Sequence, residues 1–276
     1  MYRVAMPEPL LPGEMSEEFW RDYLTNGDPR ERRMRKFYAR IPSSPRCKAC
    51  AAPFGGYGGH AMRFIGRRPS SQNPGLCNAC FDFMREHRGG AEIRVTMLFA
   101  DVRGSTRLAE TMSATEFHKL LARFYRVATE AVFSNGGGVD KFVGDELVAM
   151  FYPIMAGDEH PSAAIEAARQ LMRVTGNVGS DKPWLPIGAG VHTGQAWVGA
   201  IGDETHVELT ALGDAVNVAS RLASVAKAGE IIVSLESARE AHLDLDMPHE
   251  SLDLKGRQDP IDVIRLTLAS EAGAAA

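Results

Sequence analysis

The stretch Ile93-Arg-Val-Thr-Met-Leu-Phe-Ala-Asp-Val-Arg-Gly-Ser-Thr106 joins a strand pattern to a helix pattern. Its first part, up to Ala100, is β-branched and apolar, which predicts a buried strand. Asp101 follows that strand directly, and a helical pattern begins around Gly104, Ser105 and Thr106. A carboxylate beside the backbone N–H groups of a helix start predicts a cation site next to a phosphate site.

A second carboxylate stands in the hairpin pattern Lys141-Phe-Val-Gly-Asp-Glu146. Apolar runs on both sides of Val143-Gly144 predict that this pair forms a two-residue turn. Asp145 would then meet Asp101 if the first strand pairs with the hairpin. Two carboxylates with no Cys or His nearby favour Mg²⁺ or Mn²⁺ over zinc. Either motif alone is more simply explained as a turn, but together in this strand context they predict a metal site.

A helix pattern in Leu209-Thr-Ala-Leu-Gly-Asp-Ala-Val-Asn-Val-Ala-Ser-Arg221 carries the third polar group. Asn217 and Arg221 are four residues apart and therefore project from one face of the helix, while Val218 and Leu222 can pack inward. A guanidinium beside an amide suits a phosphoryl group that is being transferred. The alternative is a surface pair without a chemical role.

Strand and helix signals alternate around these motifs. We expect helices over much of 16–40, from Ser113 (a capping box with Glu116), from Pro161 to Gly176 and at 214–226. We expect further strands at 187–191, 196–201, 206–210, 230–234 and 261–267. The pattern predicts an α+β fold, a sheet with helices mainly on one face. The expected organisation is a helical segment (1–46), a four-cysteine module (47–88), a Gly89-Gly90 linker, a main domain (93–268) and a flexible tail (269–276).

Composition excludes several classes of protein. The 276 residues are 45% apolar and 24% charged, which is typical of a globular chain, and 31 Lys and Arg against 35 Asp and Glu give a net charge of −4. A broadly basic protein that wraps nucleic acid is therefore excluded. The N-terminus has no apolar signal-like run, and no stretch approaches the roughly 18 apolar residues of a membrane span, so we expect a cytoplasmic protein.

Taken together, the motifs resemble the catalytic domain of class III nucleotidyl cyclases over about residues 93–268. The resemblance rests on Phe99-Ala-Asp-Val-Arg-Gly-Ser-Thr106, Lys141-Phe-Val-Gly-Asp-Glu146, Gly213-Asp-Ala-Val-Asn-Val-Ala-Ser-Arg221 and the weaker Leu254-Lys-Gly256, all in the family's order. It implies a ferredoxin-like, palm-type domain that converts ATP to 3′,5′-cyclic AMP and pyrophosphate for intracellular signalling. The ribose 3′-oxygen would attack the α-phosphorus with the help of two divalent metal ions.

The resemblance also implies a role for each matched residue. The two metal ions would lie at Asp101, Val102 and Asp145, and Asn217 and Arg221 would stabilise the transition state. The substrate would contact Gly104, Ser105, Thr106, Lys141 at the purine, Thr210, and Lys255 at the terminal phosphates, a role that Arg257 could also take.

Two positions bear on the substrate. Lys141 favours ATP over GTP, since an ammonium can donate to N1 of adenine whereas guanine presents an N1–H donor. Thr210 stands where many relatives have Asp, as in a subgroup of the family associated with responsiveness to bicarbonate. The open alternatives are a guanylate cyclase, a catalytically silent nucleotide-binding sensor, and a diguanylate cyclase, whose Gly-Gly-Asp-Glu-Phe core is similar to Val143-Gly-Asp-Glu-Leu147. The helix with Asn217 and Arg221, together with Lys141, argues against a diguanylate cyclase.

A symmetric homodimer with the active site between two chains is a further expectation, and the family resemblance implies it as well. If Val143-Gly144 is the turn, Phe142 pairs with Asp145 and Lys141 with Glu146. Alternation would then put Lys141 and Asp145 on opposite faces of the sheet, so that one chain could not aim both at one nucleotide.

The four cysteines form two Cys-x-x-Cys pairs, Cys47 with Cys50 and Cys77 with Cys80, separated by 26 residues. This spacing predicts a four-thiolate structural zinc site, which would fold a segment too rich in Gly, Pro and Arg to fold by burial alone. An iron–sulfur cluster is the alternative. The nearby His60 and His87 are expected to be ordinary exposed histidines. A zinc ribbon that binds nucleic acid stays open because the segment is basic, with Arg63, Arg67, Arg68, Arg85 and Arg88.

Overall fold

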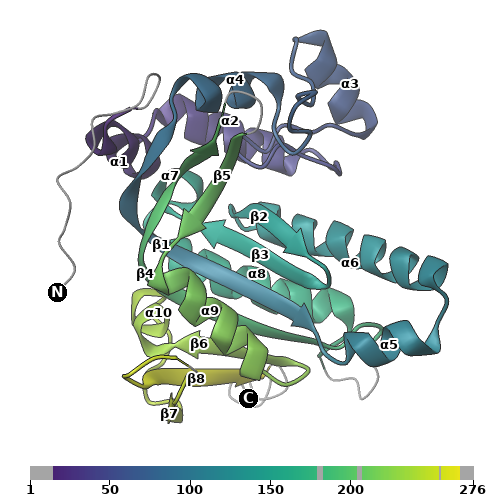
Figure 1. Ribbon diagram of the computed structural model, residues 1–276, viewed down its shortest axis with the longest axis vertical. Coiled ribbons are helices and arrows are strands. Elements are labelled where there is room, and N and C mark those ends of the chain that lie inside the picture. The colour runs from purple at the N-terminus through teal and green to yellow at the C-terminus, as the bar shows by residue number, and fades with distance from the viewer. Residues whose placement is uncertain (1–14, 179–182, 204–206, 255, 268–276) are drawn as a thin grey trace.

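One mixed sheet forms the centre of the protein (Figure 1). The computed structural model describes residues 15–178, 183–203, 207–254 and 256–267. Their strands are β1 (Gly89–Val102), β2 (Gly138–Val143), β3 (Glu146–Phe151), β4 (Ile187–Gly202), β5 (Val207–Leu212), β6 (Glu230–Ser234), β7 (His249–Leu252) and β8 (Ile261–Thr267). The order across the sheet is β2-β3-β1-β4-β6-β8-β7, and β5 pairs with β4. Only the β4–β6 pair among these is parallel, and a helix makes the crossover.

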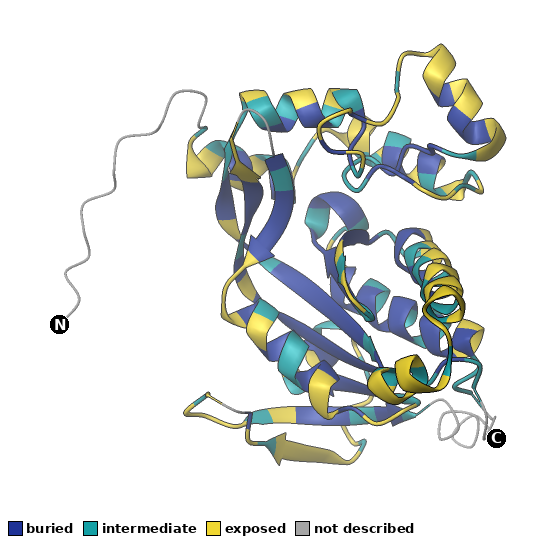
Figure 2. Ribbon diagram, turned by 45° about the vertical axis from the view of Figure 1, so that its right-hand side comes forward, coloured by how far each residue is buried: buried dark blue, intermediate teal, exposed yellow. Residues whose placement is uncertain are grey.

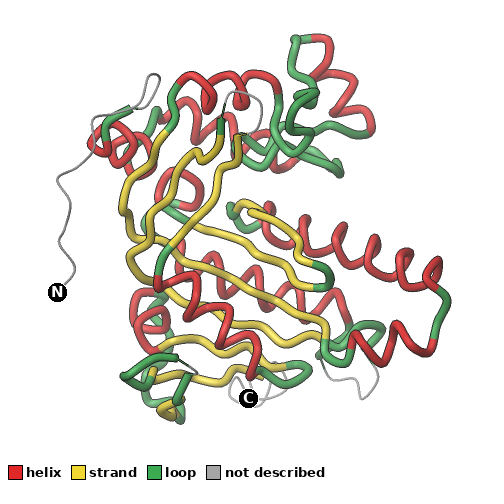
Figure 3. Tube along the Cα trace, viewed as in Figure 1, coloured by secondary structure: helices red, strands yellow, loops and turns green. Residues whose placement is uncertain are grey.

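The helices of the main domain cover both faces of this sheet, as the trace in Figure 3 shows. They are α5 (Ser105–Thr111), α6 (Ala114–Ser134), α7 (Pro153–Ala156), α8 (His160–Thr175), α9 (Asp214–Val225) and α10 (Leu235–Glu240). On one face α9 lies directly against β4, because a Cβ on Gly190 would come within 2.3 Å of the Ala223 nitrogen. On the other face Thr96 of β1 and Thr193 of β4 reach side chains of α8 and α10. The expected α+β fold is confirmed, although α9 covers the second face of a sheet whose helices were expected mainly on one.

Several helix boundaries follow from local chemistry. Ser113 caps α6 and Glu116 closes the capping box from the third helical position, as the sequence predicts. Gly176 ends α8 with φ +81°, a conformation that glycine adopts without strain. Helix α9 also begins where expected. The core lies between sheet and helices, where β1, β3, β4 and β6 are buried along most of their length (Figure 2).

A buried polar chain crosses this core. His160 bonds to the Thr96 hydroxyl at 2.8 Å, and Thr96 bonds to Thr193 at the same distance. Ser237 and Ser234 continue the chain to His192, again at 2.8 Å for the last contact. Burial lowers the pKa of both histidines to about 4, so both stay neutral near pH 7.

The N-terminal helices pack at one end of the sheet, where α1 contacts β1 and α4 contacts β5 (Figure 1). These helices are α1 (Glu17–Thr25), α2 (Pro29–Arg40), α3 (Gly56–Phe64) and α4 (Asn78–Glu86). Arg35 is buried and donates to the Gly137 carbonyl at 2.6 Å, and the Asn73 amide donates to the Val207 carbonyl at 2.9 Å. These buried bonds tie the module to the sheet. Among the described residues, no helix combines the length and apolar character that a membrane crossing requires.

Three local expectations were wrong. The helix expected over 16–40 is two helices, because Gly27 (φ +52°) and Pro29 interrupt it. Gly89 and Gly90 are not a linker but the first residues of β1. Position 90 requires glycine, because a Cβ there would lie only 2.5 Å from the carbonyl oxygen of Val198. The strands expected at 187–191 and 196–201 are one strand, β4. The tail 269–276 lies outside the described residues.

The hairpin register also differs from the expectation. Val143 pairs with Glu146 and Lys141 pairs with Val148, so the turn is Gly144-Asp145 and not Val143-Gly144. Gly144 adopts φ +60° at the first turn position, which glycine tolerates. A bulge at Asp140 shifts the register further along β2. Because Val148 in turn pairs with Phe99, Lys141 lies on the same face of the sheet as Asp101. Asp145 itself lies in the turn, so strand alternation does not place it on the face opposite Lys141, as the expected register did.

Candidate functional site

Three carboxyl groups gather where β1 ends beside the hairpin turn. Asp101 pairs across the sheet with Glu146, and Asp145 precedes Glu146 in the turn. Burial raises the pKa of Asp101, and the nearby charge of Asp145 raises it further against the opposing effect of Arg103. Burial, followed by the charges of Asp101 and Asp145, raises the pKa of Glu146 to about 7. A divalent cation would relieve this repulsion, so the residues fit the predicted Mg²⁺ or Mn²⁺.

Arg103 connects this acidic cluster to α9. Its guanidinium forms an ion pair with Asp101 and donates to the Ser224 carbonyl at 3.1 Å. Between them Val102 is buried, and Gly104 (φ +71°) turns the chain into α5. The predicted phosphate-contacting residues Gly104, Ser105 and Thr106 thus lie at the start of α5, directly beyond the acidic cluster, and Gly104 and Thr106 are exposed.

The outer face of α9 carries the predicted Asn–Arg pair. Asn217 is exposed and Arg221 is half-buried, while Val218 and Leu222 of the same helix pack with Leu254. This packing brings Leu254 to α9, and nearby the Arg221 guanidinium lies 3.4 Å from the position of a Cβ on Gly256. Lys255 itself lies outside the described residues. Arg257, its alternative, forms an ion pair with Asp214 at the start of α9.

A second cluster joins Lys141 to Thr210 through Asp140, a residue that the sequence analysis did not single out. The Thr210 hydroxyl donates to Oδ2 of Asp140 at 3.0 Å, and the Lys141 ammonium lies 3.5 Å from the same oxygen. Asp140 is 3% exposed, and its other oxygen has no hydrogen-bond partner. Burial raises its pKa, although Lys141 and Thr210 oppose the shift. An aspartate inside the apolar run 139–142 was the signal that could have revealed it.

The four cysteines come together as predicted. Their sulfur atoms all lie within 4.8 Å of one another, and the Sγ atoms of Cys50 and Cys77 are 3.8 Å apart. Four thiolates around zinc at about 2.3 Å place sulfurs roughly 3.8 Å apart, so the arrangement fits a tetrahedral metal. Hydrogen bonds with Cys47 lower the pKa of Cys50 and of Cys77 and raise that of Cys80, whereas burial raises the pKa of Cys47.

The basic side chains of the cysteine module do not all face solvent. Arg67 turns toward the cluster and donates to the Sγ atoms of Cys50 and Cys77 at 3.6 and 3.7 Å. His60 is exposed and His87 half-buried, and each bonds through Nδ1 to a carbonyl four residues earlier in its own helix. Neither belongs to the group of four cysteines.

An open mixed sheet with paired carboxylates at the end of its central strand, an Asn–Arg helix beside them and a Lys–Asp–Thr cluster on β2 and β5 defines a domain of the nucleotidyl cyclase class. Comparison with known families agrees. The model of the adenylate and guanylate cyclase catalytic domain matches residues 91–263, well over half of the chain. The chain belongs to this family.

The similar proteins include both adenylate cyclases and a guanylyl cyclase. The adenylate cyclase of Anabaena cylindrica is 28% identical over 62% of this chain, and adenylate cyclase 1 of Rhizobium meliloti is 31% identical over 66%. The matches span 36% and 30% of those proteins, so the chain corresponds to about a third of their length. The crystal structure of adenylyl cyclase CyaB from P. aeruginosa aligns with a TM-score of 0.55 at 30% identity, covering 64% of this chain and 95% of that one. Guanylyl cyclase Cya2 aligns at 0.56 and 27%, covering 64% and 93%.

Proposed function

We propose that this protein is an adenylate cyclase that converts ATP to 3′,5′-cyclic AMP and pyrophosphate in intracellular signalling. The observation that carries the choice of ATP is the hydrogen bond from Thr210 to Asp140 beside Lys141. A hydroxyl has one proton, and Thr210 donates it to Asp140, so its oxygen faces a ligand as an acceptor. Lys141 offers only donors.

The hydrogen-bonding groups of Thr210 and Lys141 complement those of the adenine edge. Adenine presents a donor at its 6-amino group and an acceptor at N1, which match Thr210 and Lys141 respectively. Guanine presents the reverse, an acceptor at O6 and a donor at N1. In the same orientation both of its contacts would be mismatched, and unpaired polar groups in a closed site cost far more than an absent contact.

The remaining residues support a phosphoryl-transfer reaction. Asp101 and Asp145 would hold two Mg²⁺ or Mn²⁺ ions, with Val102 beside them, and these ions would supply charge neutralisation at the phosphates and a more acidic 3′-hydroxyl. Gly104, Ser105 and Thr106 would contact the phosphates and, by family resemblance, so would Lys255. Asn217 and Arg221 would donate to the oxygens that gain charge as pyrophosphate leaves.

The test of this activity is product formation by the purified protein. Incubation with ATP and Mn²⁺ should yield cyclic AMP and pyrophosphate in equal amounts, and bicarbonate is added in a parallel sample because Thr210 is typical of the bicarbonate-responsive subgroup. Asp101→Asn and Asn217→Ala should each lower the rate at least a hundredfold, since each removes a group that acts on the phosphates. Asp246→Asn, on an exposed loop, is the matched control and should leave the rate unchanged. A folded, metal-loaded protein that makes no cyclic nucleotide would be a silent sensor instead.

We also propose a symmetric homodimer whose two active sites lie between the chains. Three large apolar side chains are exposed near site residues: Val143 (56%) precedes Asp145, Leu212 (51%) follows Thr210, and Val225 (46%) follows Arg221. A second chain would cover such a surface. The carboxylates of one chain would then face the purine cluster and α9 of the other.

Mixing two inactive variants tests the shared site. In a mixed dimer of Asp101→Ala with Arg221→Ala, one site collects both lesions and the other has neither. Random exchange at equal amounts makes half the dimers mixed, so activity should recover to roughly a quarter of wild type. Subunit exchange is verified with differently labelled chains. No recovery despite proven exchange would mean that each chain builds its own site.

The cysteine centre is proposed to hold one structural zinc ion per chain. Support comes from the sulfur spacing and from the composition of the module, where the segment between α3 and α4 contributes only Leu76 and Cys77 to the buried core. Metal binding would therefore supply much of the module's folding free energy. The module would in turn brace α1 and α2 against the sheet.

A further inference from the structure

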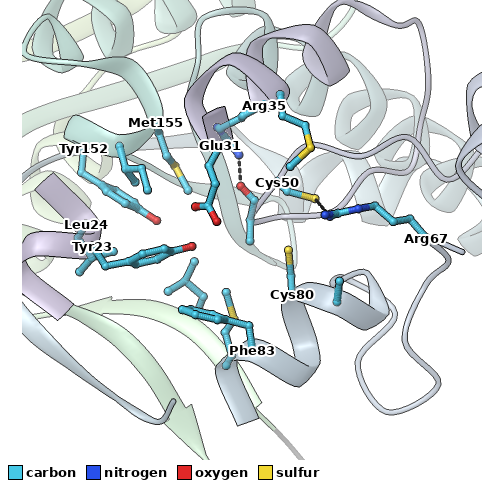
Figure 4. A pocket seen from close by; sticks show the side chains of 16 residues that line it. Tyr23, Leu24, Glu31, Arg35, Cys50, Arg67, Cys80, Phe83, Tyr152 and Met155 are labelled. Atoms are coloured by element: carbon cyan, nitrogen blue, oxygen red, sulfur yellow. Dashed lines mark hydrogen bonds between the residues drawn. The ribbon is translucent and has the colours of Figure 1, made fainter. Parts of the chain in front are cut away.

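The cysteine module contacts both strands that carry the purine cluster, β2 and β5. On the β2 side, the buried Arg35 joins the loop 47–50 to the strand. Its guanidinium donates to a carbonyl of that loop (Figure 4) and, at 2.6 Å, to the carbonyl of Gly137, directly before β2. The Lys48 carbonyl lies against the same place, since a Cβ on Gly138 would come within 3.3 Å of it. The first cysteine pair therefore rests on the start of β2.

On the β5 side, the loop between α3 and α4 makes the contact. The buried Asn73 amide donates to the carbonyl of Val207, the first residue of β5, at 2.9 Å, and its oxygen accepts from the Gly75 N–H at 3.0 Å. Lys48 meets this loop from the other side. Its N–H donates to the Gly75 carbonyl at 2.9 Å, and its Cε lies 3.0 Å from where a Cβ on Gly75 would stand. Lys48 thus joins the part of the module on β2 to the part on β5.

The hydrogen bond between Asp140 and Thr210 crosses between the same two strands. Asp140 is the bulged residue of β2, and its buried Oδ1 has no hydrogen-bond partner in the part of the chain that the structure describes. Lys48 is half-buried, and its ammonium forms no hydrogen bond or ion pair with a described residue. Burial raises the pKa of Asp140, and the charge of Lys141, the bond from Thr210 and the charge of Lys48 oppose that rise.

The charges around Asp140 come from two sides. Lys141 lies on its own strand and Lys48 comes from the cysteine module. Tyr152, directly after β3, also senses the charge of Asp140, but burial raises the pKa of its phenol, which therefore stays neutral near pH 7. Because Lys141 is the group that donates to the purine in our account, Lys48 is the charge that serves Asp140 alone.

We propose that Lys48 is a positioning residue of the purine site, because its charge keeps Asp140 ionised. An ionised Asp140 accepts the proton of Thr210, whose oxygen then faces the 6-amino group of adenine. When Asp140 is protonated, the Thr210 hydroxyl is free to turn and donate to O6 of guanine. This inference rests on the proposed nucleotide site and gives the cysteine module a part in the choice of substrate.

Equilibrium binding of 3′-deoxy-ATP and 3′-deoxy-GTP at pH 8.5 and pH 6.0 tests the role of Lys48. Both analogues lack the attacking hydroxyl, so calorimetric titration of the metal-loaded full chain with Mg²⁺ measures affinity without turnover. The ratio of the two Kd values cancels any effect of pH that the analogues share. Lys48→Met keeps the aliphatic stem over Gly75 and removes the charge. Its preference for the adenine analogue should match wild type at pH 8.5 and fall at least about threefold below wild type at pH 6.0, because the lost charge no longer opposes protonation of Asp140.

Three comparisons separate this role from a structural one. Lys48→Arg keeps the charge and should stay within twofold of wild type at both pH values. Lys36→Met, exposed on α2 and not among the groups that act on Asp140, is the matched control and should bind like wild type. In Asp140→Asn the titrating group is gone, so adding Lys48→Met should not make the preference depend on pH. A role in folding alone would instead weaken both analogues equally at both pH values.

The inference is overturned if Lys48→Met behaves like Lys36→Met, if Lys48→Arg loses the preference as Lys48→Met does, or if wild type binds both analogues equally or neither. Failure of the proposed activity has a different signature. A chain that binds the adenine analogue selectively but makes no cyclic AMP from ATP keeps the role of Lys48 and loses the enzymatic assignment.

Discussion

Replacing Asp140 by Asn tests how the structure sets the choice of purine. Asp140 touches no nucleotide in our account. It is a positioning residue that accepts the proton of Thr210 at 3.0 Å and lies 3.5 Å from the Lys141 ammonium. A hydrogen bond to a charged group is worth about 1.5–3 kcal/mol and a neutral one about 1. Removing the charge of Asp140 should therefore weaken the positioning of Thr210 and Lys141 by about 1.5 kcal/mol. This free energy corresponds to a roughly tenfold change in kcat/KM for ATP.

The expected consequence is a change in selectivity. With Asn at 140 the Thr210 hydroxyl can turn and donate its proton to O6 of guanine. The kcat/KM for ATP should fall about tenfold while that for GTP stays level or rises. Stability should not fall, because the buried Asp140 carboxyl has a raised pKa and one unpartnered oxygen, so its charge is a cost to folding.

The assay measures kcat/KM for both nucleotides in Asp140→Asn, Thr210→Ala and the double variant. If the two residues act through one hydrogen bond, the double variant loses no more ATP selectivity than the worse single variant. Asp246→Asn is the control for a change of Asp to Asn on the surface. Equal losses for ATP and GTP would show that Asp140 has a structural role only and does not set the choice of purine.

Three further predictions concern other parts of the molecule. Lys141→Glu should sharply reduce cyclic AMP formation, and unchanged ATP turnover in that variant would contradict the assignment of the purine-reading ammonium. Elemental analysis of anaerobically purified protein should find one zinc per chain, and Cys77→Ser should lose it and lower the unfolding midpoint. Iron with acid-labile sulfide, or no metal, would count against zinc. Finally, because burial lowers the pKa of His160 and His192 from about 6.5 to about 4, the unfolded chain binds more protons between these values, and the unfolding free energy should fall as pH drops from about 6.5 to 4. Replacing both by Gln should flatten that dependence, whereas the exposed His118→Gln should not.

Patterns of short range were readable from the sequence. Ser113 and Glu116, three residues apart, mark the start of α6. The apolar spacing of 214–226 predicts α9 and the shared face of Asn217 and Arg221. Both rest on interactions between residues three or four apart, which sequence spacing determines directly. The clustering of the four cysteines could also be predicted, since two Cys-x-x-Cys pairs at this spacing are typical of a metal site.

Long-range features were not readable in the same way. The turn at Gly144-Asp145 differs by one residue from the expected one, which moves the β3 partner of Lys141 by two positions, from Glu146 to Val148, and takes Asp145 out of the strand pairing. The bulge that turns Asp140 toward Thr210 joins residues 70 positions apart. Likewise, the contact of Lys48 with the start of β2 depends on how the cysteine module docks on the sheet, and no local spacing encodes that docking.

The central claim is that this chain makes cyclic AMP from ATP with a site that selects adenine. Equal concentrations of ATP and GTP in one vessel with Mn²⁺ test it most directly, because the ratio of cyclic AMP to cyclic GTP, quantified by mass spectrometry, equals the ratio of the two kcat/KM values. Cyclic AMP should exceed cyclic GTP at least tenfold. An excess of cyclic GTP, or nucleotide left unchanged by folded, Mn²⁺-supplied protein, would contradict it.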